Sequence, residues 1–191
     1  MSYLETNLLP LVLSIKTPKT DSFIMHAAGL GDKTSQQSIL IQMGNRLEDF
    51  WNQVISECAN NLIKETDKIK VGTTNRQIDI LFEAKNKPII YYRDAKANMN
   101  FDTEKKPASN DKIEAVGAAI SAKYQKEVSS GYFIPCVSEV PEDIEKKYPN
   151  IKIDGVNWMM NTLNCNLFTV DEFFEFFKEI IGPILSEKMY G

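Results

Sequence analysis

The sequence is poor in several residue types on which common chemistries depend, and each shortage excludes a class of protein. Its three cysteines, Cys58, Cys136 and Cys165, are widely spaced without a CxxC pair, so neither a disulfide framework nor a structural zinc site is supported. The single histidine, His26, leaves too few imidazoles for a histidine metal centre, and a serine-histidine triad would have to use it. The segment GLGDK at 29–33 departs from the phosphate-loop pattern GxxxxGK[ST], so no nucleotide cofactor is expected.

Long apolar runs are also lacking. No run reaches the roughly eighteen residues that cross a bilayer, so we expect no membrane segment. The apolar patch from Leu8 to Ile15 is interrupted by Pro10 and has neither a basic lead nor a small-residue cleavage site, which argues against a signal peptide. Together with the cysteine usage, this predicts a cytoplasmic protein.

What is present suits one compact domain. The chain has 191 residues, 43% of them hydrophobic, with no repeat or linker, so we predict a single domain over residues 1–191. Apolar spacing and turn residues predict an α/β fold, with a central mixed β-sheet flanked by α-helices. The predicted helices cover 35–65, 107–129, 141–148 and 170–185; the predicted strands cover 68–71, 77–84, 89–97, 132–140 and 151–153, the first three as an antiparallel meander and the fourth, which contains Pro135, at an edge or bulge.

Charge is distributed unevenly along the chain. The net charge is −4, yet residues 84–126 hold nine Lys or Arg against five Asp or Glu. Residues 139–188 hold ten acidic residues against five basic ones. The middle of the chain is therefore the part suited to face phosphates.

The most informative stretch, RQIDILFEAKNKPIIYYRDAKAN, covers residues 76–98. Its apolar run Ile89–Tyr92 has the pattern of a central strand covered on both faces, yet it continues directly into Arg93, Asp94 and Lys96. Because side chains alternate along a strand, Asp94 and Lys96 share one face and Arg93 lies on the other. Charges at such a strand end cost desolvation unless they are paired, hydrated or bound to a metal.

The preceding strand supplies a second carboxylate. A hairpin about the KNKP turn at residues 85–88 would bring Asp79 and Asp94 together at its open end. Two converging carboxylates repel unless a cation lies between them, and hard oxygen ligands favour Mg²⁺ or Mn²⁺. Lys96 projects from the strand about 6 to 7 Å beyond Asp94. A metal beside an ammonium group is suited to phosphodiester hydrolysis.

These residues also resemble a known pattern. Asp79, followed fifteen residues later by Asp94-Ala95-Lys96, resembles the PD-(D/E)xK nuclease motif, with Ile78 where the family often has Pro. Glu48, on the first long predicted helix, resembles the additional upstream acid of many members. The stretch DAKANMNFDTEKK, followed by a predicted helix, is similar to the continuation of the motif in small type II restriction endonucleases. The resemblance covers residues 38–137.

The resemblance implies a restriction-endonuclease-like core and a working site. Asp79, Asp94 and the backbone carbonyl of Ala95 would hold Mg²⁺, for which Mn²⁺ could substitute; Lys96 would orient or help deprotonate the attacking water, and Glu48 would assist a metal. It implies hydrolysis of double-stranded DNA at a short, two-fold symmetric sequence, leaving 5′-phosphate ends. It also implies a homodimer in a prokaryotic cell.

Several alternatives stay open from the sequence. Glu83 could replace Asp79, and Asp94 with Lys96 could be a solvated ion pair at a strand end. The chain could also be a repair or junction-resolving nuclease of the same superfamily, or a non-catalytic DNA-binding protein with this fold. For DNA contact the candidates beyond the strand are Asn98, Lys105 and Lys112, with residues 16–33 as a recognition loop. Arg93 has no predicted role.

Overall fold

The computed structural model describes residues 1–17, 19–20, 33–59, 67–84, 87–97, 105–148 and 150–190, with backbone alone at 19–20, 33–34 and 105–109. By its internal contacts the chain forms two compact units, Met1–Phe50 with Leu167–Gly191, and Trp51–Asn166. Each unit is described by itself. The predicted single nuclease domain stays a prediction.

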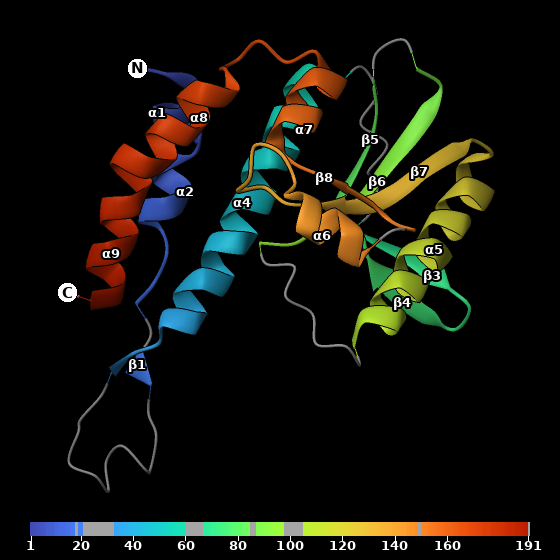
Figure 1. Cartoon of the computed structure of the whole chain (residues 1–191), viewed down its shortest axis with the longest axis horizontal. Coiled ribbons are helices and arrows are strands. Elements are labelled where there is room, and N and C mark those ends of the chain that lie inside the picture. The colour runs from blue at the N-terminus through green and yellow to red at the C-terminus, as the bar shows by residue number, and fades with distance from the viewer. Residues whose placement is uncertain are drawn as a thin grey trace, which may run out of the picture. The chain divides into compact units, whose positions relative to one another are not determined.

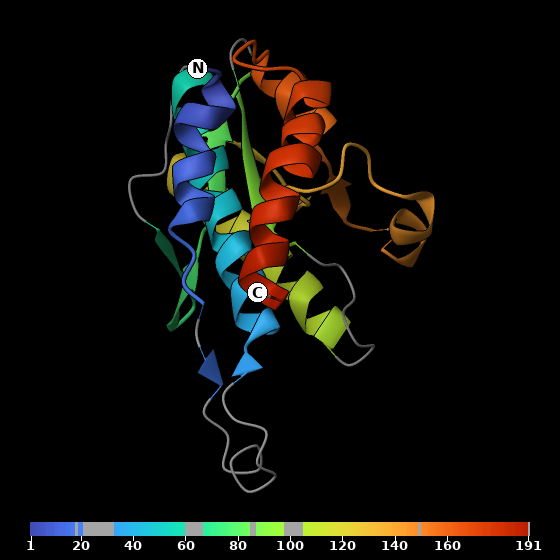
Figure 2. The same ribbon diagram turned by 90° about the vertical axis from the view of Figure 1, so that its left-hand side faces the viewer.

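The first unit is mainly helical. It contains α1 (Tyr3–Asn7), α2 (Leu9–Leu13), most of α4 (Gln36–Cys58), α8 (Val170–Phe176), the π-helical segment η1 (Phe177–Ile181) and α9 (Gly182–Tyr190), with β1 (Lys19–Thr20) paired to β2 (Lys33–Thr34). Capping boxes begin α1 and α8, which explains why these short helices start where they do. Figure 2 shows the N-terminal helices, α4 and the C-terminal helices running alongside one another. Their core is a cluster of aromatic rings from Tyr3, Phe50, Phe168 and Phe173.

The second unit is built around a four-stranded sheet. Its strands are β5 (Ile80–Glu83), β6 (Ile89–Ala95), β7 (Glu127–Phe133) and β8 (Lys152–Asp154), in that order across the sheet (Figure 1). β5 is antiparallel to β6, whereas β6, β7 and β8 are mutually parallel, so the sheet is mixed as predicted. β6 is an inner strand with five consecutive buried residues, which confirms the prediction of a strand covered on both faces.

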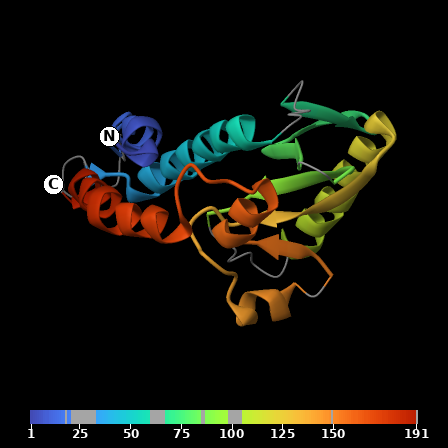
Figure 3. The ribbon, with the colours of Figure 1, turned by 90° about the horizontal axis from the view of Figure 1, so that it is seen from above.

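Helices cover both faces of this sheet. On one face α5 (Lys105–Tyr124) packs Ile113, Val116 and Ile120 into a core with Tyr92 and Tyr132 of the strands. On the other, Trp51 near the end of α4 meets Phe133 edge-on, and Trp158 of α7 (Val156–Leu163) contacts Phe82 and Tyr91. Figure 3 shows the strands between α5 and α7. The alternation of side chains along β6 therefore sends its odd and even residues toward different helices.

Several predicted element boundaries are wrong. The predicted meander divides into two sheets, because the predicted strand over 77–84 breaks at Ile78 and Asp79. β3 (Lys68–Val71) pairs instead with β4 (Thr74–Gln77), a strand that the exposed sequence TNRQ did not reveal. β7 begins before the predicted strand at 132–140 and ends before Pro135, and it is an inner strand rather than an edge. Helix α7 was not predicted, whereas α6 (Glu142–Lys147) and β8 were.

In the part of the chain that the structure describes, no helix is both long enough and apolar enough to cross a membrane.

Candidate active site

The β5–β6 hairpin brings Asp79 and Asp94 together, as the sequence predicts. Ile80 is paired with Arg93, so Asp79 lies next to Asp94 at the open end of the hairpin. The Ala95 N–H donates a hydrogen bond of 3.0 Å to Asp79 Oδ2, which fixes one carboxylate against the end of β6. The Asp79 carbonyl in turn accepts a 2.9 Å hydrogen bond from Asn52 Nδ2 on α4. No pattern in the sequence predicted this contact.

Asp94 is the centre of a charged cluster. Its side chain is only 3% exposed, and its two oxygens take different lysines: Lys112 Nζ lies 2.6 Å from Oδ1, and Lys96 Nζ is paired with Oδ2. Lys96 extends from the end of β6, while Lys112 comes from α5, eighteen residues along the chain from Asp94. Lys112, predicted only to contact DNA, therefore joins the same cluster as the predicted acid-x-Lys unit.

The environment of Asp79 disfavours its charge. Burial raises the pKa of its carboxyl above the ordinary value, and the neighbouring charge of Asp94 raises it further. The hydrogen bond from Ala95 and the charges of Lys96 and Lys112 act in the opposite direction, but the pKa stays raised. Such a pair of partly buried carboxylates is stabilised by a cation placed between them.

Tyr92 adds an unsatisfied polar group beside these carboxylates. Its ring is fully buried, two residues before Asp94 on the same face of β6, and its hydroxyl has no hydrogen-bond partner among the described residues. Burial, and then the charges of Asp94 and Asp79, raise the pKa of this phenol. Strand alternation from Asp94 could have identified Tyr92 in the sequence.

The oxygen atoms of this cluster suit a divalent cation that retains water ligands. Two carboxylates are available, and the Ala95 N–H that faces Asp79 turns the carbonyl of the same residue toward that side in regular strand geometry. Mg²⁺ is usually held by one or two carboxylates, with waters and substrate phosphates completing its octahedron. Among the described residues, no group of three or more His, Cys, Asp or Glu side chains is arranged to hold a metal. The fit is therefore to a metal shared with substrate rather than to a closed protein cage.

The other predicted site residues have different positions. Glu48 is half-buried on α4, in the first unit, so its predicted part in the site stays a prediction. Asn98 lies outside the described residues, as do His26 and most of the predicted recognition loop, and Lys105 begins α5 with only its backbone described. Glu83 is at the opposite end of β5, where both its oxygens accept hydrogen bonds from Lys126, so it does not replace Asp79.

Arg93 has a structural environment of its own on the opposite face of β6. Its side chain is 1% exposed, and Nε donates a 2.7 Å hydrogen bond to Asp154 Oδ2. The other guanidinium nitrogens donate to the carbonyls of Tyr92 and Ser129 and to the Ser129 hydroxyl. Its Cζ lies 4.4 Å from the ring centroid of Trp158. The guanidinium joins β6, β7, β8 and α7, and it does not face Asp94.

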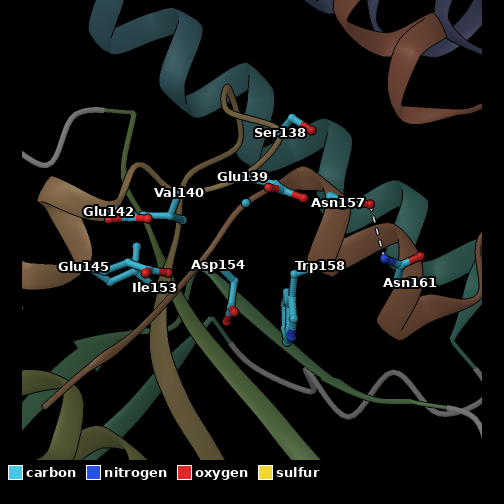
Figure 4. Close-up of a pocket in the computed structure, with 11 residues that line it drawn as sticks. Ser138, Glu139, Val140, Glu142, Glu145, Ile153, Asp154, Asn157, Trp158 and Asn161 are labelled. Atoms are coloured by element: carbon cyan, nitrogen blue, oxygen red, sulfur yellow. Dashed lines mark hydrogen bonds between the residues drawn. The ribbon is translucent and has the colours of Figure 1, made fainter. Parts of the chain in front are cut away.

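A hollow separate from the Asp79–Asp94 cluster lies near Asp154, at the ends of β7 and β8. Its volume is about 440 Å³, and Figure 4 shows Asp154 and Trp158 on one side of it. The residues that line it include four acids and no Lys or Arg; the acids are Glu139, Glu142, Glu145 and Asp154. Because carboxylates repel phosphates, this hollow is unsuited to nucleic acid. The hollow therefore differs from the Asp79–Asp94 cluster, in which two lysines offset the two carboxylates.

We expect Asp79→Asn to stabilise the metal-free protein at neutral pH, by about 0.5–2 kcal/mol. Asn keeps an oxygen to accept the Ala95 N–H but carries no charge. The folded pKa of Asp79 lies above its unfolded value. The stability that the protonated Asp79 contributes is therefore fully present below the unfolded pKa and is lost as pH rises through the folded pKa. Urea unfolding in EDTA at a series of pH values should show the gain growing from acid to neutral pH. A loss of stability at pH 7 would contradict this electrostatic account.

Comparison with known proteins gives no relative: no family model, no curated protein and no solved structure matches the chain.

Proposed function

We propose that the protein is a Mg²⁺-dependent endodeoxyribonuclease of the type II restriction kind. The observation that carries this proposal is the convergence of Asp79 and Asp94 on adjacent strands, with Lys96 paired to Asp94. The α/β fold with a mixed central sheet and helices on both faces is compatible with a restriction-endonuclease-like core. Mg²⁺ and Mn²⁺ are the ions that suit these oxygen donors.

The proposed chemistry distributes distinct tasks among these groups. A divalent ion held by Asp79, Asp94 and the Ala95 carbonyl would polarise the phosphoryl oxygens and lower the pKa of a bound water. Lys96, already at the Asp94 carboxylate, would orient the attacking water and stabilise the negative charge that develops on the phosphoryl oxygens. Lys112 lies on the other oxygen of the same carboxylate and offers a second ammonium group to substrate phosphate. The Tyr92 hydroxyl can donate a hydrogen bond to an oxygen bound between the carboxylates.

The substrate and assembly follow from the same proposal. Double-stranded DNA is the proposed substrate, and cutting both strands of a two-fold symmetric sequence suits a homodimer. The products carry 5′-phosphate and 3′-hydroxyl ends. A repair or junction-resolving nuclease would share the chemistry but cut branched or damaged DNA, and a non-catalytic DNA-binding protein would not cut at all.

The test is incubation of the purified protein with supercoiled plasmid and Mg²⁺ or Mn²⁺. We expect discrete linear fragments with 5′-phosphate ends, complete loss of cleavage in EDTA, and recovery when the metal is restored. Four-way-junction DNA incubated in parallel distinguishes restriction from junction resolution. Absence of cutting on every substrate, across a range of salt and metal concentrations, would overturn the proposal.

A further inference from the structure

The β3–β4 hairpin comes just before Asp79 in the sequence, and its outer surface is polar. All four residues of β4 are exposed, and they read TNRQ. In β3 only Ile69 is buried, whereas Lys68 and Lys70 on either side of it are exposed. Over residues 67–77 the hairpin carries three basic residues and one acidic residue, a local charge of +2 in a chain of net charge −4. This surface attracts polyanions.

The pairing register identifies which side chains share the outer face. Lys68 is paired with Gln77, and Lys70 with Asn75, so these four residues point the same way. Ile69 and Val71 alternate with the two lysines and belong to the core that includes α5. One face of the hairpin is therefore held against α5, as Figures 1 and 3 both show, and the other presents two lysines and two amides.

We infer that this outer face, formed by Lys68, Lys70, Asn75 and Gln77, contacts double-stranded DNA and reads bases next to the cleaved bond. A two-stranded ribbon fits the major groove, in which the amides of Asn and Gln pair with adenine N6 and N7. Lysines beside them supply the contacts to phosphate. The inference rests on the proposed function for its choice of DNA as the polyanion, and its test includes a binding measurement that needs no cleavage.

Two links couple this ribbon to the proposed site. Asn75 and Gln77 precede Asp79 by four and two residues, at most about 14 and 7 Å of extended chain. With about 3.4 Å between successive base pairs, the bases read lie within roughly four base pairs of the attacked phosphate. In addition, Arg76 of β4 and Lys112 of α5 line one cavity of about 300 Å³, and Lys112 also contacts Asp94. Arg76 is paired with Ile69, so this second link runs along the inner face of the hairpin, and Asp111 also lines the cavity.

The test measures binding in EDTA, by fluorescence anisotropy with labelled 24-base-pair DNA duplexes of randomised sequence. We expect Lys70→Ala and Lys68→Ala each to weaken binding about 3- to 10-fold on every sequence, and to lower the slope of log affinity against log salt by about 1. Lys147→Ala is the matched control, because Lys147 is also an exposed lysine, on α6 beside the acidic hollow, and this variant should bind DNA as the wild type does.

Base reading is tested by sequencing the duplexes that each protein selects from the randomised pool. Asn75→Ala and Gln77→Ala should each relax the preference at one position by roughly 5- to 100-fold while leaving the salt slope unchanged. Unchanged affinity in both lysine variants, unchanged selection in both amide variants, or tighter binding to duplex RNA would overturn the inference even if the wild type cuts plasmid. Ribbon-dependent DNA binding by a protein that never cuts would instead uphold the inference and reject the nuclease.

Discussion

Asp94→Asn should lower the rate of DNA cleavage by about 10³-fold or more, because it removes a ligand from the proposed metal site and several kcal/mol of transition-state stabilisation with it. Lys96→Ala should lower the rate by about 10²- to 10³-fold, the usual cost of losing one group that stabilises developing charge. Both are measured as single-turnover rates on one DNA fragment that the wild type cuts. Lys96 is partly exposed, so its removal should leave the fold intact.

Glu83→Gln is the matched control for these variants. Glu83 lies on the same hairpin and also pairs with a lysine, but at the end away from Asp79. We expect it to cut within about threefold of the wild-type rate, since its charge acts on Lys126 rather than on the site. If Glu83→Gln lowered the cleavage rate as much as Asp94→Asn does, the metal would have to lie elsewhere on the hairpin. Undiminished cleavage in both Asp94→Asn and Lys96→Ala would reject the site itself.

The second large effect concerns stability rather than catalysis. Arg93→Met should destabilise the protein by about 3–5 kcal/mol, because it leaves Asp154 partly buried without its charged partner. Burial already raises the pKa of Asp154, and the Arg93 charge opposes that shift, so loss of the guanidinium should raise this pKa further. The carbonyls of Tyr92 and Ser129 also lose the hydrogen bonds that the guanidinium donates. The measurement is urea unfolding at pH 7, followed by circular dichroism.

Two comparison variants distinguish the effect of a buried ion pair from that of a solvent-exposed ion pair. In the double variant Arg93→Met with Asp154→Leu, the unpaired carboxylate is absent, so most of the lost stability should return. Lys146→Met breaks an ion pair on α6 whose side chains are 75% and 84% exposed, and it should change stability by no more than about 0.5 kcal/mol. Equal losses in Arg93→Met and Lys146→Met would contradict the structural role assigned to Arg93.

Local pattern was sufficient to predict the hairpin that carries Asp79 and Asp94. The apolar run Ile89–Tyr92 predicted the buried strand, and the KNKP sequence predicted its antiparallel neighbour. Strand alternation correctly placed Arg93 and Asp94 on different faces. Contacts between elements distant in sequence could not be read in this way. Lys112 reaches Asp94 from α5, and Arg93 meets Asp154 sixty-one residues away, because tertiary packing brings these elements together.

The predicted strand boundaries were wrong where a strand consists mainly of polar residues. β4 is fully exposed and has no apolar alternation, so only its pairing with β3 defines it as a strand. β7 begins with mostly polar residues, and this first part is strand because it pairs with β6; only Gly131 to Phe133 also pair with β8. β4 was missed because its residues are polar, and the proposed DNA contact depends on the same polar residues.

The position of the metal tests the central claim most directly. Fe²⁺ bound at a divalent-metal site reduces added hydrogen peroxide to hydroxide and a hydroxyl radical, and ascorbate returns the resulting Fe³⁺ to Fe²⁺. These radicals break the polypeptide backbone close to the ion, where mass spectrometry can locate the breaks. We predict breaks at Asp79 and at Asp94 to Lys96, suppressed by excess Mg²⁺ and absent in Asp94→Asn. Breaks confined to the acidic hollow at Glu139, Glu142 and Glu145, or an unchanged pattern in Asp94→Asn, would contradict the account.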